Sequence, residues 1–201
     1  MSTPQDLMIV SMDVASSPPI EPGDLSLALA GAELIDLLGA RAVVLDGDRL
    51  VRGDGPVTGD HLLEQAASAL VDREPYETVE DWLWRRGRNL STVYRAGLRA
   101  AGLTTVSSPR WRPWAAGEPV LLESPARRGA LARWTSGEPV LAALGAAAGI
   151  RGDRAAIEVD DATDDAVATV LAAVHDAVEE LQSVRQRKDI EKAAFDNIWR
   201  A

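Results

Sequence analysis

The sequence alternates helix-length segments that carry one apolar face with short segments that have hairpin spacing. Residues 24–39 place leucine and isoleucine at helical intervals, and Gly39 marks the end of the predicted helix. Residues 41–52 hold two short apolar strands on either side of Asp46-Gly47, a dipeptide that favours a tight turn. A helix at 90–103 is followed by residues 104–124, which predict a second hairpin or a loop with weak strands. The alternation predicts a mainly α fold of packed helices with short β-hairpins, and the abundance of Ala and Leu favours helix.

Local signals set the limits of the other expected helices. Asp24 or Ser26 is expected to cap the first helix, and Thr58 or Asp60 the second. The helix at 90–103 is expected to bury one face, which is made of Leu90, Val93, Tyr94 and Leu98. The remaining helices are expected at residues 58–75, at 78–86 behind a Thr78–Asp81 capping box, twice within 127–150, and at 164–188 with a tail that can continue the helix.

Length and composition indicate one soluble domain. With 201 residues and 46% apolar content, the chain suits a single domain over 1–201, with an N-terminal segment at 1–19 and a helical tail at 188–201. There is no cysteine, which excludes disulfides and thiolate chemistry. The start of the chain lacks the pattern of a signal peptide, and no apolar run approaches the roughly 20 residues that span a bilayer. We therefore expect a cytoplasmic protein.

Charge is unevenly distributed along the chain. The net charge is −10, yet the segment 85–133 holds ten arginines against Glu118 and Glu123, a local charge of +8. The remainder of the chain therefore carries −18. Such asymmetry suggests a local anionic partner, whereas the acidic total argues against general nucleic-acid binding.

The sequence offers no catalytic or metal-binding pattern. It contains no glycine-rich phosphate loop and no dinucleotide-binding motif. His61 lies three positions before Glu64, which would supply only half of a metal site, so we interpret His61 and His175 as surface residues. The Asp-rich segments lack the spacing of a calcium loop. We expect no enzyme activity, no catalytic residue, no metal and no cofactor.

The most unusual segment is SSPRWRPWAAG, residues 107–117, which interleaves arginine with tryptophan and contains no acidic residue. Arginine pairs with phosphate groups, and tryptophan favours the membrane–water boundary. A hairpin tip that carries Arg110, Trp111, Arg112 and Trp114 therefore suits an anionic lipid surface. In the alternative interpretation, the two tryptophans cover the core and the arginines pair with the acidic remainder of the chain.

Three segments, in the right order, resemble one known family. PVTGDHLLEQAASALVDREPYETVEDWLWRR resembles the P-T-G-D-x-L-L and E-T-V-x-x-W blocks of the Golgi phosphoprotein 3 family. LALAGAELIDLLGARAVVLDGDRL is similar to the preceding helix and strand of that family, and YRAGLRAAGLTT to a later helix. The resemblance covers roughly residues 20–150. The Ala- and Arg-rich, Lys-poor composition is typical of a high-GC bacterium, so the resemblance is to a bacterial-type member.

The resemblance implies a mostly helical domain that associates peripherally with membranes. Eukaryotic members bind phosphatidylinositol 4-phosphate, act as adaptors that retain glycosyltransferases in the Golgi, and self-associate. Their membrane-contacting hairpin corresponds to the segment after Gly102, which contains the arginine–tryptophan run. Their phosphate pocket is mostly missing here. The positions of its tryptophan and three arginines correspond to Glu21 or Pro22, Ala30, Arg88 and Ser91.

We therefore predict a peripheral membrane-associated lipid-binding or adaptor module on the inner face of the membrane. Seven residues are expected to contact anionic lipid or phosphate: Arg85, Arg86, Arg88, Arg110, Trp111, Arg112 and Trp114. The alternative is a protein-interaction scaffold or self-associating regulator, whose hairpin or C-terminal helix docks a protein partner or a second copy. A winged-helix DNA binder is the least favoured hypothesis, and no nucleic-acid partner is expected.

Overall fold

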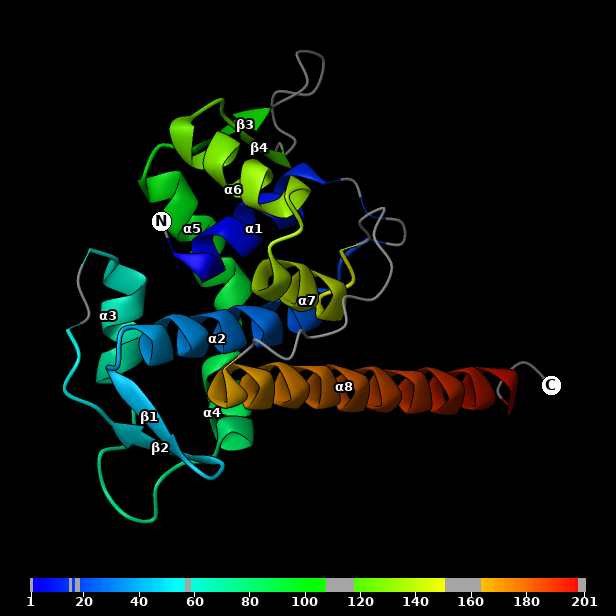
Figure 1. Ribbon diagram of the computed structural model, residues 1–201. Coiled ribbons are helices and arrows are strands. Elements are labelled where there is room, and N and C mark those ends of the chain that lie inside the picture. Colours follow the sequence, from blue (N-terminus) through cyan, green and yellow to red (C-terminus); the bar gives the residue numbers. More distant parts are fainter. Residues whose placement is uncertain are drawn as a thin grey trace.

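The computed structural model describes residues 2–14, 16, 19–56, 59–107, 118–150 and 164–198 (Figure 1). Its elements, in chain order, are α1 (Thr3–Asp13), α2 (Pro22–Gly39), β1 (Val43–Asp46), β2 (Arg49–Arg52), α3 (His61–Ser68), α4 (Val79–Arg86), α5 (Leu90–Ala100), β3 (Thr104–Ser107), β4 (Glu118–Leu121), α6 (Pro125–Thr135), α7 (Pro139–Ala147) and α8 (Asp165–Ile198). Helices dominate, and the strands form two separate antiparallel pairs. The predicted mainly α fold with short hairpins is confirmed.

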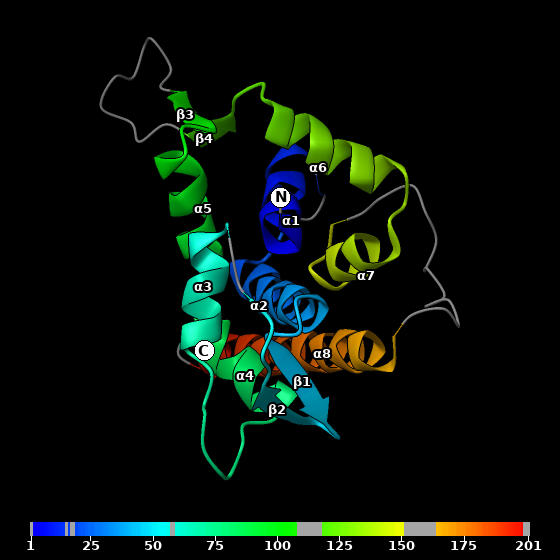
Figure 2. The same cartoon turned by 60° about the vertical axis from the view of Figure 1, so that its left-hand side comes forward.

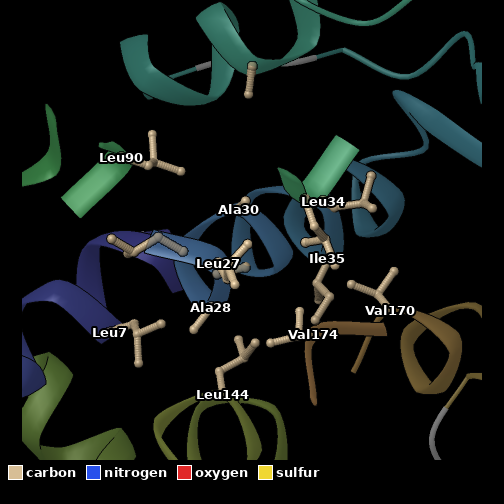
Figure 3. Packing of buried hydrophobic residues seen from close by; sticks show 14 of the residues in the cluster. Leu7, Leu27, Ala28, Ala30, Leu34, Ile35, Leu90, Leu144, Val170 and Val174 are labelled. Carbon is tan, nitrogen blue, oxygen red and sulfur yellow. The ribbon is translucent and has the colours of Figure 1, made fainter. Parts of the chain in front are cut away.

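Helix α2 is the centre of the molecule. Its sequence is rich in Ala and Leu on all sides, which is typical of a helix buried all round. It packs against α1, α4, α5, α7 and α8 (Figures 1 and 2). Figure 3 shows Leu7 of α1, Leu144 of α7 and Val174 of α8 approaching the α2 side chains between them. At Gly31 the approach of α8 is so close that an added Cβ would lie 2.3 Å from Val174 Cγ2.

The start of α2 differs from the prediction. The helix begins at Pro22, so the expected caps Asp24 and Ser26 lie inside the helix. Proline is favoured at the start of a helix because its φ is already helical and its missing N–H is not needed. Ser26 Oγ instead donates to the Pro22 carbonyl (2.6 Å), and Asp24 accepts from Arg185 Nη1 of α8 (2.6 Å). The predicted caps are therefore wrong, although the predicted end at Gly39 is confirmed.

Two later helix starts agree with the sequence. The Asp60 carboxylate accepts from the backbone N–H of Leu62 (2.9 Å), so it caps α3. The other candidate, Thr58, lies outside the described residues. Thr78 Oγ1 accepts from the backbone N–H of Asp81 (3.0 Å) at the start of α4, as the capping-box spacing predicts.

The face of α5 agrees with the prediction except at one position. Leu90, Tyr94 and Leu98 are buried, but Val93 is 39% exposed. The three buried residues are four apart, and residue 93 lies about 100° around the helix from Tyr94. The predicted burial of Val93 is therefore wrong, and its side chain belongs to the outer surface of α5.

Both predicted hairpins are present. Strands β1 and β2 pair with Leu45 opposite Leu50, and Gly47 in the turn between them has a φ of +62°. Strands β3 and β4 pair from Thr104–Leu121 to Ser107–Glu118, which decides between the hairpin and the loop with weak strands in favour of the hairpin.

Both ends of the chain form helices, one unexpected and one expected. The N-terminal segment 1–19 contains α1, whose Leu7, Met8, Ile9 and Val10 are buried. This helix was not predicted from the sequence. At the other end α8 runs without a break to Ile198, which confirms that the tail continues the helix. Its distal half extends past α2 and α7 (Figure 1).

Candidate functional site

The hairpin of β3 and β4 carries the arginine–tryptophan run between its strands. The predicted site residues Arg110, Trp111, Arg112 and Trp114 lie in 108–117, outside the described residues. Their attachment is described, because Ser107 and Glu118 on either side form the last pair of the two-stranded sheet. The run therefore connects the open end of a β-ribbon that lies at one edge of the molecule (Figures 1 and 2).

The described strands of this hairpin expose apolar side chains. Val106 and Val120 are each 47% exposed, and Leu122 directly after β4 is 43% exposed. Val106 pairs with Pro119, whereas Val120 pairs with Thr105 one position along. Since successive residues of a strand point to opposite faces, the ribbon is apolar on both faces. Exposed apolar side chains that are gathered in one place are typical of a surface that binds a protein or a membrane.

Arg85 is held by a carboxylate of its own chain. Its Nε and Nη2 donate to the two oxygens of Glu77 at 2.6 and 2.7 Å, and Nη2 also donates to the Ala69 carbonyl (3.0 Å). The hydrogen bond that Arg85 donates to Glu77 raises the pKa of Arg85. The guanidinium also lies over the buried Trp82 ring, 5.3 Å from its centroid. Its charge is thus satisfied within the fold.

Arg86 forms an ion pair that is more deeply buried than that of Arg85. Its Nε and Nη2 donate to the two oxygens of Glu33 at 2.7 and 2.8 Å, and the Glu33 side chain is fully buried in α2. The Tyr94 hydroxyl donates to the same carboxylate (2.9 Å). Burial raises the pKa of Glu33, and its bonds to Arg86 and Tyr94 act in the opposite sense. Arg86 is therefore part of the core connection between α2, α4 and α5.

Arg88 remains available. It lies in the turn between α4 and α5, its side chain is exposed, and its guanidinium has no hydrogen bond or ion pair with any residue that the structure describes. Of the three predicted site residues that are described, Arg88 alone can offer its charge to an external anion. Arg85 and Arg86 have the right charge but are occupied.

The positions that correspond to the family's phosphate pocket are filled by internal packing. Ala30 is fully buried, and its carbonyl accepts from Trp82 Nε1 (3.2 Å). Ser91 is 4% exposed, its N–H donates to Ser26 Oγ (3.0 Å), and its hydroxyl donates to the Pro22 carbonyl (3.2 Å). A phosphomonoester needs several convergent donors. At these described positions only Arg88 could supply one.

Sequence reasoning missed two further free cations on α5. Arg95 and Arg99 are exposed, and neither guanidinium has a partner among the described residues. The signal was present in the sequence, since no Asp or Glu occurs from residue 82 to residue 117. An arginine in that stretch needs a carboxylate from elsewhere in the fold to form an ion pair. Among its described residues, Arg85 and Arg86 of α4 have such a partner, and the arginines of α5 do not.

The described residues show neither a metal-binding cluster nor a membrane-spanning helix. No group of three or more His, Asp or Glu side chains among them is placed to hold an ion. None of the helices, as far as the structure describes them, combines the length and the apolar character needed to cross a bilayer. His61 is exposed at the start of α3, where its Nε2 contacts Gln65 Nε2 (2.9 Å).

These features define a mainly helical domain whose exposed β-ribbon lies beside arginines that have no partner in the part of the chain that the structure describes. Comparison with protein families gives a match to the family described as Golgi phosphoprotein 3 (GPP34) over residues 4–186. The chain therefore belongs to the Golgi phosphoprotein 3 family, as the resemblance indicated. This is a non-enzymatic family. A search of curated protein sequences gave no significant match.

Proposed function

We propose that this protein associates peripherally with anionic membrane surfaces, and that the β3–β4 hairpin is the contact. The observation that carries the proposal is the ribbon itself. It exposes Val106 and Val120, and the residues that join its strands are SPRWRPWAAG. Indole rings and valines can enter the headgroup region while the arginines stay at the level of the phosphates. The cytoplasmic face of a membrane carries anionic lipids, which fits these charges.

The proposal assigns different roles to the seven residues predicted from sequence. Trp111 and Trp114 insert, Arg110 and Arg112 pair with headgroup phosphates, and Arg88 adds charge from the α4–α5 turn. Arg85 and Arg86 are left out because Glu77 and Glu33 occupy them. Selective recognition of phosphatidylinositol 4-phosphate is also left out, because Ala30 and Ser91 stand buried at two of its donor positions.

Vesicle binding tests the proposal. At low ionic strength the protein is expected to co-sediment with vesicles that contain phosphatidylglycerol and to stay in solution with vesicles of phosphatidylcholine alone. Binding should weaken as salt is added, because exposed charges are screened over about 10 Å at 0.1 M ionic strength. Protein spun without vesicles controls for aggregation. Equal partitioning onto the two vesicle types at low salt would contradict the proposal.

Self-association is the second candidate function, and one observation favours it. Ile190, on the distal half of α8, is 69% exposed, and the neighbouring described residues 186–192 are exposed as well. A helix that extends beyond the core with an apolar residue on its surface can dock a second copy. Light scattering separates the two functions, since a lipid-binding monomer needs no dimer in solution and a scaffold of this kind does.

A further inference from the structure

We propose that the outer face of α5 forms a second lipid-contact surface beside the hairpin. Its residues are Arg95 and Arg99, with Arg88 in the turn that precedes the helix. Their ligands are the phosphates of several singly charged lipids at a bilayer surface. This inference rests on the proposed membrane association and adds to it the face of the helical body that lies against the bilayer.

The geometry of α5 separates this face from the core. Leu90, Tyr94 and Leu98 are buried against α2 and its neighbours. Arg95 and Arg99 are exposed and four residues apart, so they lie one above the other about 6 Å apart along the helix axis. Side chains at this spacing cover the same strip of the helix surface. The strip therefore carries two guanidinium groups.

Arginines without an ion pair are a minority among the described residues of this acidic protein. Most of those elsewhere pair with carboxylates, as Arg52 does with Asp72, Arg127 with Asp13 and Glu123, Arg133 with Asp6 and Glu138, and Arg185 with Asp24. Arg41 and Arg73 are exceptions away from α5. Among the described residues, no carboxylate forms an ion pair with Arg88, Arg95 or Arg99. The positive charge of these three arginines is therefore not neutralised within the described structure, and it complements an anionic surface.

The strip is continuous with the hairpin. Helix α5 ends one turn after Arg95, and Gly102, with a φ of +69°, turns the chain directly into β3. The Leu103 N–H donates to the Leu98 carbonyl (2.9 Å) and fixes this junction. In Figure 2 the helix leads into the ribbon at one edge of the molecule. A flat surface that meets the ribbon therefore also meets the C-terminal end of α5.

The chemistry of the strip fits many weak headgroup contacts rather than one tight phosphate. Its guanidiniums are exposed and stand a helical turn apart. No buried donor converges with them among the described residues, in contrast to a site for a phosphomonoester. Each basic residue close to an anionic surface strengthens binding roughly fivefold.

A matched pair of variants tests the inference. Arg95→Gln/Arg99→Gln is expected to bind phosphatidylglycerol vesicles about 25-fold more weakly than the unaltered protein at low salt. Arg41→Gln/Arg73→Gln removes the same charge from two exposed arginines that have no partner among the described residues and lie near the β1–β2 hairpin and after α3. This control should change binding less than about twofold. Arg95→Lys/Arg99→Lys should keep most of the affinity, because the interaction with the headgroups depends on the positive charge and not on bidentate geometry.

The outcomes separate this inference from the proposed function. If both glutamine variants weaken binding equally, only net charge matters and the α5 surface is rejected while membrane association stands. If the lysine variant binds as weakly as Arg95→Gln/Arg99→Gln, the assignment to diffuse headgroup charge is wrong. If the unaltered protein ignores phosphatidylglycerol, both proposals fall.

Discussion

Replacing Arg86 by methionine is expected to lower the free energy of unfolding by about 3–5 kcal/mol. The variant leaves the Glu33 carboxylate, which is fully buried, without its bidentate partner and with the Tyr94 hydroxyl as its one remaining donor. A buried charge without a partner is strongly unfavourable. Chemical denaturation monitored by circular dichroism measures the loss.

Two companion variants make this prediction specific. Arg88→Met removes an exposed arginine two positions away that has no partner among the described residues, so it should alter stability by less than about 0.5 kcal/mol. Adding Glu33→Gln to Arg86→Met removes the buried charge but keeps an acceptor for Tyr94, so part of the stability should return. A loss below about 1 kcal/mol in Arg86→Met would contradict the assignment of Arg86 to the core.

Replacing Trp111 and Trp114 together by alanine is expected to weaken binding to phosphatidylglycerol vesicles at least about tenfold. Each indole buries about 150–250 Å² of surface when it is fully inserted. At about 25 cal/mol per Å², even partial insertion contributes more free energy than the roughly 1.4 kcal/mol that a tenfold change in affinity requires. Flotation with a fixed amount of protein and increasing lipid measures it. Because the arginines remain, residual binding should be abolished by salt.

The matched control for this prediction is Trp111→Phe/Trp114→Phe. Phenylalanine keeps an aromatic ring of similar apolar character, so most of the affinity should be retained. Both double variants should unfold like the unaltered protein if the residues lie at the hairpin tip. An alanine variant that binds vesicles normally would show that the hairpin is not the contact. One that is strongly destabilised would show that the indoles belong to the core.

Local features of the fold could be predicted from sequence where neighbours in the chain decide the structure. The Thr78–Asp81 capping box, the Asp60 cap and the tight turn at Gly47 each depend on residues within a few positions. Helix α1 was missed because it is buried among α2, α6 and α7 and so lacks a polar face with a helical period. The α2 caps failed because Pro22 starts the helix one turn earlier.

The candidate site was harder to predict because ion pairs connect distant parts of the chain. The partner of Arg86 is Glu33, 53 positions earlier, and no spacing rule links them. The local charge of the basic segment therefore included Arg85 and Arg86 as if they had no partner. Arg95 and Arg99 lay in the same basic segment but matched no motif, and only the structure showed that both are exposed beside the buried Tyr94 and Leu98.

The most direct test of the central claim is a fluorescent label on the hairpin. The chain has no cysteine, so Ala115→Cys gives a single attachment point for an environment-sensitive dye, and Ser183→Cys on exposed α8 gives the control. With phosphatidylglycerol vesicles, the emission of the dye at position 115 should shift to the blue while that at position 183 stays unchanged. Emission at position 115 that remains typical of water while the protein co-sediments with the vesicles would contradict the account.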